Sequence, residues 1–316
     1  MNVNLFKTPI NMSQQSILVT GATGNQGQGV VRSCLSSTTY KVYALVRDPL
    51  RAAAQDLEKR GAVLVKGDLG DSASLAAALE QLKPTTVFLN PPPGSEAAQL
   101  SHARNVINAA KAAPSVQTMI YSSASGADRP ENFPKDPANP MYEYWITKNE
   151  IENLVRSAGF PNWTIVQLGF FMQLFVPPVS NHMFPELWGS NDGRRVIRTA
   201  FWPETKLHVI DGGDIGAVVA VALQKPEEFR ERTVNLAAEA LTTSELAKKI
   251  GKARGEKIEV VHETAEDLAR KLGPMGPRLV AAQDLFNDIG FSIDIKRNQE
   301  EFDLTSVEDF FSKAEV

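Results

Sequence analysis

The stretch ILVTGATGNQGQGVV, residues 17–31, decides the fold of this 316-residue chain. An apolar run ends at Val19, and apolar residues resume at Val30. Between them stand three glycines at three-residue spacing: Gly21, Gly24 and Gly27. Such a series, after a strand and at the start of a helix, is typical of a dinucleotide-binding turn. The first glycine permits the tight turn, the second a close approach of a pyrophosphate, and the third close packing of helix on strand.

The helix that begins at this turn directs unpaired N–H groups and the positive end of its dipole toward the phosphates. We therefore predict cofactor contacts from the glycines and from polar residues of the same turn: Thr23, Asn25 and Gln26. A purely structural turn is the alternative, because glycines also occur in ordinary turns.

Short β-rich runs alternate with helical patterns through the first half of the chain. The predicted strands are residues 16–21, 41–47, 62–68, 86–90, 118–123 and 163–169. Apolar residues at intervals of three and four predict helices between them, for example over 72–82 and 98–113. Strands that are apolar on both faces indicate helices on both sides of a parallel sheet. The sequence thus predicts an α/β protein with a doubly wound parallel sheet of the Rossmann type.

The character of the sequence changes after Gly169, where prolines and aromatic residues gather in FFMQLFVPPVSNHMFPELWG. We expect loops and short helices there, with later strands within 206–216 and 232–238. The predicted organisation has an N-terminal extension over 1–15 and a cofactor-binding Rossmann domain over 16–170, completed by about 206–236. A smaller mixed C-terminal cap on the substrate side takes in 171–205 and 237–316.

Composition limits the classes of partner. A formal net charge of −4 gives no basic face for nucleic acid or for an anionic membrane. Apolar runs stay below the roughly 18 residues of a membrane span, and the N-terminal residues do not resemble a secretory signal. The single cysteine, Cys34, fits a reducing compartment, and we expect a cytoplasmic protein. The four histidines are far apart in the sequence, so we predict no metal site.

The preference between NAD and NADP depends on the end of the second predicted strand. An acidic residue there binds the ribose 2′-hydroxyl of NAD, whereas an arginine suits the 2′-phosphate of NADP. This strand ends in Arg47 followed by Asp48, with Arg51 close by. The planar guanidinium of Arg47 matches a phosphate with two parallel hydrogen bonds, and we predict NADP(H) as the cofactor.

Other strand ends are predicted to border the same cofactor, because ligands of such sheets bind at the carboxyl ends of the strands. The third and fourth strands supply two pairs of residues that flank the adenine and its ribose: Asp68 with Leu69, and Asn90 with Pro91. The sixth strand ends near Leu168, and the backbone from there to Phe171 is expected to lie along the nicotinamide.

Seven motifs follow one another between about Ser16 and Phe311: TGATGNQG, ALVRDP, GDLGD, IYSSASG, YWITKNEIE, LGFFMQ and DIGAVVA. In this order they resemble the NmrA-like family, which are atypical relatives of the extended short-chain dehydrogenase/reductases. The resemblance implies a Rossmann domain that binds NADP(H) and a smaller cap that shapes a ligand cleft. It implies either a reductase of quinones, aromatic carbonyl compounds or natural-product intermediates, or an NADP-sensing regulator.

Tyr144 and Lys148 are the candidate catalytic pair. Residues four positions apart share one helix face, and short-chain reductases use a tyrosine and a lysine at this spacing. The tyrosine gives its proton to the developing alkoxide, and the lysine ammonium lowers the pKa of the tyrosine and binds the nicotinamide ribose. The end of the fifth strand offers Ser122, Ser123 and Ser125 for orienting the substrate carbonyl, and Ser123 is the closest match by position, with the choice among the three left open. A half-buried aromatic with a solvated lysine is the structural alternative.

The sequence therefore predicts an NADPH-dependent oxidoreductase that reduces a carbonyl, enone or quinone of a small aromatic or natural-product-like substrate. The alternative is a non-catalytic regulator that senses NADP(H) and acts through a protein partner; a third possibility is a redox-neutral reaction. Substrate identity and oligomeric state do not follow from the sequence. We expect an apolar cleft for a flat aromatic substrate, lined by Phe170, Phe171, Met172, Phe175, His182, Phe184, Trp188 and Trp202.

Overall fold

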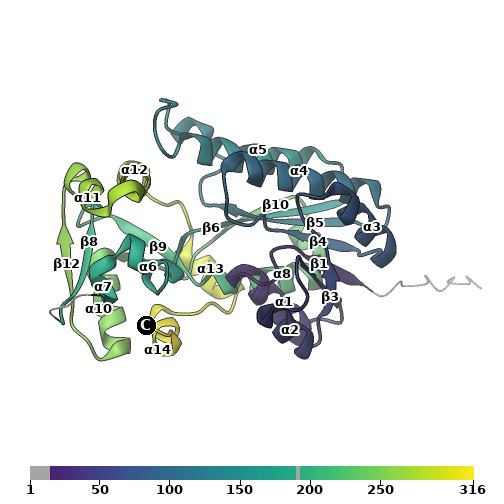
Figure 1. The fold of residues 1–316 in the computed structure, drawn as a ribbon, viewed down its shortest axis with the longest axis horizontal. Coiled ribbons are helices and arrows are strands. Elements are labelled where there is room, and N and C mark those ends of the chain that lie inside the picture. Colours follow the sequence, from purple (N-terminus) through teal and green to yellow (C-terminus); the bar gives the residue numbers. More distant parts are fainter. Residues whose placement is uncertain (1–14, 190–192) are drawn as a thin grey trace, which may run out of the picture.

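A seven-stranded parallel sheet forms the larger lobe of the protein (Figure 1). The computed structural model describes residues 15–189 and 193–316, so the predicted N-terminal extension lies outside it except for residue 15. The strand order is β10-β6-β5-β4-β1-β2-β3, which confirms the doubly wound sheet. The strands are β1 (Ser16–Val19), β2 (Lys41–Val46), β3 (Val63–Lys66), β4 (Thr86–Leu89), β5 (Thr118–Ala124), β6 (Asn162–Leu168) and β10 (Arg232–Leu236).

Helices cover both faces of this sheet (Figure 1). One layer contains α1 (Asn25–Ser37), α2 (Ala52–Lys59) and α8 (Ile215–Gln224); the other contains α3 (Ser72–Leu82), α4 (Glu96–Ala112) and α5 (Tyr142–Ser157). Strand residues alternate between the two cores: Ile17 and Val19 pack in the first, and Leu18 packs in the second. This burial on both faces explains why the strands read as continuous apolar runs.

Glycines bring α1 and α8 into direct backbone contact. A Cβ at Gly29 would overlap the carbonyl group of Gly213, and a Cβ at Gly216 would overlap the carbonyl group of Gly29. Gly213 lies in the short η3 turn (Gly212–Asp214) that leads into α8. The segment after residue 206 is thereby held against the glycine turn of the first βα unit.

A smaller lobe contains two further sheets and most of the remaining helices (Figure 1). The three-stranded sheet has the order β11-β9-β7, with β7 (Phe170–Phe171), β9 (Lys206–Ile210) and β11 (Glu239–Thr242); β8 (Arg195–Thr199) pairs with β12 (Ile258–His262). Its helices include α6 (Ser180–Met183), α7 (Pro185–Trp188), α10 (Thr243–Arg254), α11 (Ala265–Leu272) and α12 (Gly276–Ile289). Three more short helices are α9 (Pro226–Phe229), α13 (Ile295–Glu301) and α14 (Val307–Lys313).

The segment predicted to complete the Rossmann domain, 206–236, is divided between the two lobes. Within it α8 packs on α1, and β10 extends the main sheet beside β6. In contrast, β9 pairs with β11 and β7 in the smaller sheet. Within residues 15–189 and 193–316, no helix is long and apolar enough to cross a lipid bilayer.

The contact between α1 and α8 predicts a position that does not tolerate a side chain. We expect Gly29→Ala to lower the free energy of unfolding by about 1–3 kcal/mol, because the added methyl group overpacks the crossing. Urea denaturation measures this change. Gly94→Ala is the matched control, since the nearest heavy atom to its Cβ is Ala98 Cβ at 4.0 Å. An equal change in the free energy of unfolding for the two variants, relative to the wild type, would contradict the prediction.

Candidate functional site

Two hollows lie at the carboxyl ends of the main-sheet strands, one on each side of the point where the strand order reverses between β1 and β4. The first, here named the turn pocket, has a volume of about 130 Å³ and borders the ends of β1, β2 and β3. The second, the tyrosine pocket, has a volume of about 290 Å³ and lies between the ends of β4, β5 and β6 and the smaller lobe. Ligands of open α/β sheets bind at such reversal points.

The glycine turn leaves space for a phosphate group. Gly21 has a positive φ of 62°, and a Cβ at Gly27 would overlap the carbonyl group of Gly21. At Gly24, in contrast, a Cβ would meet only the carbonyl oxygen of Gly21, at 3.5 Å. In the described part of the chain no side chain caps the N-terminus of α1, and no acidic residue lies in its first turn. This N-terminus is therefore suited to an anion.

The residues after β2 present a cation to the turn pocket. Arg47 lines the pocket. Asp48 does not line it, and its carboxylate accepts a hydrogen bond from the backbone of Leu50 at 3.0 Å. Arg51 stands at the start of α2, outside the lining. The basic member of the Arg47–Asp48 pair is thus the one that faces the hollow.

Most other residues predicted to contact a cofactor lie in one of the two walls. The turn pocket is lined by Gly21, Thr23, Asp68 and Leu69, and the tyrosine pocket by Gln26, Asn90, Leu168 and Phe171. Pro91 lines neither pocket, whereas Pro92 lines the turn pocket. Asn25, an exposed residue in the first turn of α1, also lies outside both walls.

Helix α5 places Tyr144 and Lys148 together in the tyrosine pocket. The Lys148 Nζ lies 5.7 Å from the centroid of the Tyr144 ring and donates a hydrogen bond to Gln99 Oε1 at 3.3 Å. Burial lowers the pKa of Lys148 to about 8, although the carboxylates of Glu152 and Glu96 oppose this shift. Burial also raises the pKa of Tyr144 to about 12, which a charge on Arg278 partly offsets. At neutral pH the pocket therefore contains a protonated phenol beside an ammonium group.

Ser123, the serine predicted to orient the substrate, has its hydroxyl hydrogen-bonded to a neighbouring side chain in the pocket wall. The Ser123 hydroxyl donates to Glu152 Oε1 at 2.5 Å, and Gln167 Nε2 donates to the same oxygen at 2.9 Å. Arg156 pairs with the other carboxylate oxygen at 2.7 Å. Burial raises the pKa of Glu152, while Ser123, Gln167 and Arg156 lower it. Ser123 therefore lines the tyrosine pocket as predicted, but its hydroxyl is hydrogen-bonded to a buried carboxylate.

The hydroxyls of the two neighbouring serines, Ser122 and Ser125, differ in whether they have a hydrogen-bond partner. The Ser122 hydroxyl donates to Gln26 Oε1. Ser125, which lies just beyond the end of β5, lines the tyrosine pocket, and its buried hydroxyl has no hydrogen-bond partner among the described residues. A buried hydroxyl without a partner is costly unless something else satisfies it. The geometry therefore favours Ser125 over Ser123 as the serine available to a ligand.

The apolar wall differs from the predicted one. Of the eight residues expected there, Phe170 and Phe171 line the pocket. The expectation was wrong for the others: Met172, Phe175, His182, Phe184, Trp188 and Trp202. Phe175 and Phe184 stack on each other at 4.6 Å inside the core, and Trp202 is 49% exposed. Leucines, methionines and aromatic residues supply the wall instead: Met141, Trp145, Leu174, Met183, Met275, Leu279, Phe286 and Phe291.

A continuous row of aromatic rings runs along this wall from the smaller lobe to α5. Phe291 stacks on Phe286 with centroids 4.0 Å apart, and Phe286 meets Trp145 edge to face at 6.1 Å. Trp145 in turn meets Tyr144 edge to face at 5.2 Å. Flat apolar groups pack favourably on such rings, so the pocket is shaped for an aromatic ligand.

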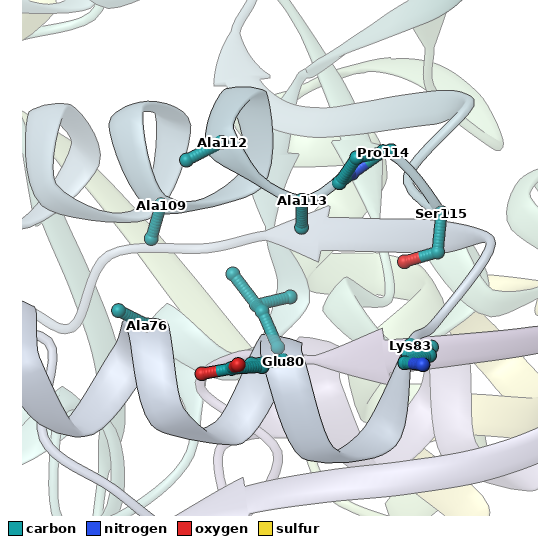
Figure 2. A pocket seen from close by; sticks show the side chains of 9 residues that line it. Ala76, Glu80, Lys83, Ala109, Ala112, Ala113, Pro114 and Ser115 are labelled. Atoms are coloured by element: carbon teal, nitrogen blue, oxygen red, sulfur yellow. The ribbon is translucent and has the colours of Figure 1, made fainter.

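A third hollow, of about 500 Å³, lies between α3 and α4 (Figure 2). Alanines make up much of its wall, and its charged side chains are Glu80 and Lys83. It lies near the ends of α3 and α4, which precede the amino ends of β4 and β5. This is the edge of the sheet opposite to the strand ends where ligands bind, and we do not assign it to the site.

Comparisons with known proteins agree with this architecture. The NmrA-like family model matches residues 13–311. An NAD(P)H azoreductase of Xenophilus azovorans is 32% identical over 82% of this chain and 81% of its own. An NmrA-like family domain-containing oxidoreductase of Penicillium ochrochloron is 29% identical over 78% and 76%.

Two solved structures have the same fold. NmrA, a negative transcriptional regulator solved in complex with NADP, superimposes with a TM-score of 0.74 at 20% identity over 95% of both chains. An NADPH-dependent quinone oxidoreductase from Escherichia coli has a TM-score of 0.72 at 24% identity, over 94% of this chain and 98% of its own. The resemblance that the ordered motifs indicated is confirmed, and this chain belongs to the NmrA-like family.

Proposed function

We propose that this protein is an NADPH-dependent oxidoreductase that reduces a carbonyl, enone or quinone group of a small aromatic or natural-product-like substrate. The observation that carries the proposal is the placement of Tyr144 and Lys148 in one pocket, beside the carboxyl ends of the strands that follow the glycine turn. The names of the relatives support it, since they include an azoreductase and a quinone oxidoreductase.

The turn pocket and the adjoining strand ends fit a dinucleotide. The open position at Gly24 and the uncapped start of α1 would hold the pyrophosphate, and Arg47 the 2′-phosphate. Asp68 and Leu69 would border the adenosine, and the nicotinamide half would extend into the tyrosine pocket. When bound, NADPH supplies the hydride. Solved neighbours include complexes with NADP, with NADPH and with NAD.

The residues of the tyrosine pocket have separate roles in this proposal. Tyr144 donates a proton to the substrate oxygen, and the Lys148 ammonium, charged below about pH 8, favours the resulting phenolate. Ser125 donates a hydrogen bond to the same oxygen. The apolar wall, to which the proposed cap segments 171–205 and 237–316 contribute Met183 and Phe286, excludes water.

The competing function is the regulator. The neighbour NmrA is named as a negative transcriptional regulator, and it shares the fold. A regulator binds NADP(H) without turnover and is indifferent to loss of the Tyr144 hydroxyl. A redox-neutral reaction such as dehydration or epimerisation is a third possibility, and it converts substrate without net loss of NADPH.

Removal of the Tyr144 hydroxyl tests the proposal. We expect Tyr144→Phe to bind NADPH like the wild type and to lose on the order of a hundredfold in turnover, because the proton donor is absent. The measurement is NADPH consumption with a panel of quinones, aromatic aldehydes and cyclic enones. Tight NADPH binding without consumption by the wild type would favour the regulator, and equal rates for both proteins would exclude Tyr144 as the acid.

The choice of cofactor is tested at Arg47. Arg47→Ala removes the guanidinium that faces the turn pocket, and we expect a large loss of NADPH affinity with little change for NADH. Arg51→Ala, at the start of the next helix, is the matched control. Titration of intrinsic fluorescence with each cofactor gives the two dissociation constants. Equal losses for NADPH and NADH would contradict the assignment of the 2′-phosphate.

The two serines are expected to respond in opposite ways. Ser123→Ala should destabilise the fold by about 1–3 kcal/mol, because Glu152 loses a buried hydrogen bond. Ser125→Ala should keep the stability and lower kcat/KM about tenfold, because the substrate oxygen loses a donor. Thermal denaturation and steady-state kinetics of both variants make the comparison. The reverse pattern would return the substrate-orienting role to Ser123.

A further inference from the structure

The charges that face the tyrosine pocket are unevenly distributed. Among the described residues that line it, the charged side chains are Lys148 and Arg278, both cations. Glu96 stands behind Arg278, and its pKa is lowered by Arg278 and Lys148 against the effect of burial. Glu152 is buried in the wall and is paired with Arg156. Arg278 and Arg156 thus each pair with a carboxylate, whereas Lys148 donates to the neutral side chain of Gln99, and the charges named here sum to a net positive charge beside the pocket.

Arg278 belongs to α12 of the smaller lobe and reaches the edge of the pocket above the candidate acid. Its Cζ lies 5.8 Å from the centroid of the Tyr144 ring. One of its terminal nitrogens, Nη2, donates to Glu96 Oε1 at 2.6 Å, and its side chain is 40% exposed. A guanidinium has five N–H donors in a planar fork, so the bond to Glu96 leaves donors for a second acceptor.

In the proposed reaction the two cations have different partners. Lys148 is committed to the nicotinamide ribose and to Tyr144. Arg278 is not assigned to the cofactor, and its charge acts on Tyr144 only by lowering the pKa of that phenol. The row of rings that includes Phe286, Phe291 and Trp145 forms the apolar wall of the same pocket. A flat ring against this wall with an acidic substituent toward Arg278 would satisfy both features.

We infer that Arg278 is a specificity-determining residue that binds the acidic group of an anionic aromatic substrate, such as an aryl carboxylate or sulfonate. The inference rests on the proposed function and narrows its substrate class. Glu96 occupies the guanidinium in the absence of substrate and competes with the substrate anion for it. Removal of Glu96 therefore strengthens anion binding, and removal of Arg278 weakens it.

A purely structural role for Arg278 leads to a different expectation. If the Arg278–Glu96 pair only fastens α12 to the start of α4, loss of either partner loosens the pocket in the same way. Both variants would then bind every ligand less tightly. The sign of the Glu96 effect therefore separates recognition of an anion from attachment of the two lobes.

The test compares two ligands of the same shape, 2-naphthoate and the neutral 2-naphthamide, by isothermal titration calorimetry. The proteins are the wild type, Arg278→Gln, Glu96→Gln and the control Arg270→Gln. Arg270 is an arginine of α11 that is 66% exposed and outside the pocket lining. Thermal denaturation first establishes that each variant is folded.

We expect the wild type to bind naphthoate about tenfold to a hundredfold more tightly than naphthamide, because a hydrogen bond between two charged groups contributes more to affinity than one to a neutral group. Arg278→Gln should abolish this preference and leave the affinity for naphthamide within twofold. Glu96→Gln should strengthen naphthoate binding several-fold, and Arg270→Gln should change neither affinity. Absence of naphthoate binding at millimolar concentration, equal loss of both ligands in Arg278→Gln, or weaker naphthoate binding in Glu96→Gln would each overturn the inference.

Failure of the inference is distinguishable from failure of the proposed function. The ligand pair is titrated into the protein with and without NADP⁺, so a protein that does not bind NADP⁺ contradicts the proposed function alone. Where turnover is found, 1,4-naphthoquinone-2-sulfonate and 1,4-naphthoquinone form the corresponding substrate pair. Arg278→Gln should then raise KM for the sulfonate at least tenfold relative to KM for the parent quinone, whereas any effect on kcat through the pKa of Tyr144 should be the same for both substrates.

Discussion

Direct backbone contact on both sides of α1 is the constraint on which the rest of the structure depends. On one side the carbonyl group of Gly21 occupies the space where a side chain at position 27 would lie. On the other side Gly29 meets Gly213 at the entrance to α8. These contacts fix the direction of α1, and hence the direction of its free N–H groups, relative to the carboxyl edge of the sheet. They also hold α8, which leads the chain to the last strand of that sheet.

Features encoded by neighbouring residues could be predicted from the sequence. The glycine spacing and the apolar runs predicted the sheet, and the four-residue spacing of Tyr144 and Lys148 placed both in one pocket. Ser123 shows where such reasoning ends. Ser122, Ser123 and Ser125 all line the tyrosine pocket, so the serine hydroxyl that is free to meet a ligand is decided by the hydrogen bonds of the folded chain. Glu152, the partner of Ser123, comes from α5, 29 residues later, and the sequence contains no local signal of the pairing.

The apolar wall could not be predicted for a related reason. Core and pocket are both built from aromatic and aliphatic side chains, so composition does not distinguish them. Phe175 and Phe184 look like cleft residues next to several prolines, yet they pack on each other in the core. Phe286 and Phe291 lie more than a hundred residues after α5 and reach Trp145 only through tertiary folding. Arg278, on α12, is likewise brought next to Tyr144 only by tertiary folding.

The reactive pair of the pocket and its cation-bearing aromatic wall therefore come from different parts of the chain. The strand ends and α5 contribute Tyr144 and Lys148, whereas α12 and the loop after it contribute Arg278, Phe286 and Phe291. The two groups share no secondary-structure element and meet only through side-chain contacts such as Phe286 on Trp145. Within this architecture, a family can acquire new ligands by accumulating changes in one helix–loop segment while the reactive helix is preserved. In evolutionary terms, this separation would allow the substrate to change while the nucleotide-binding part of the fold stays the same.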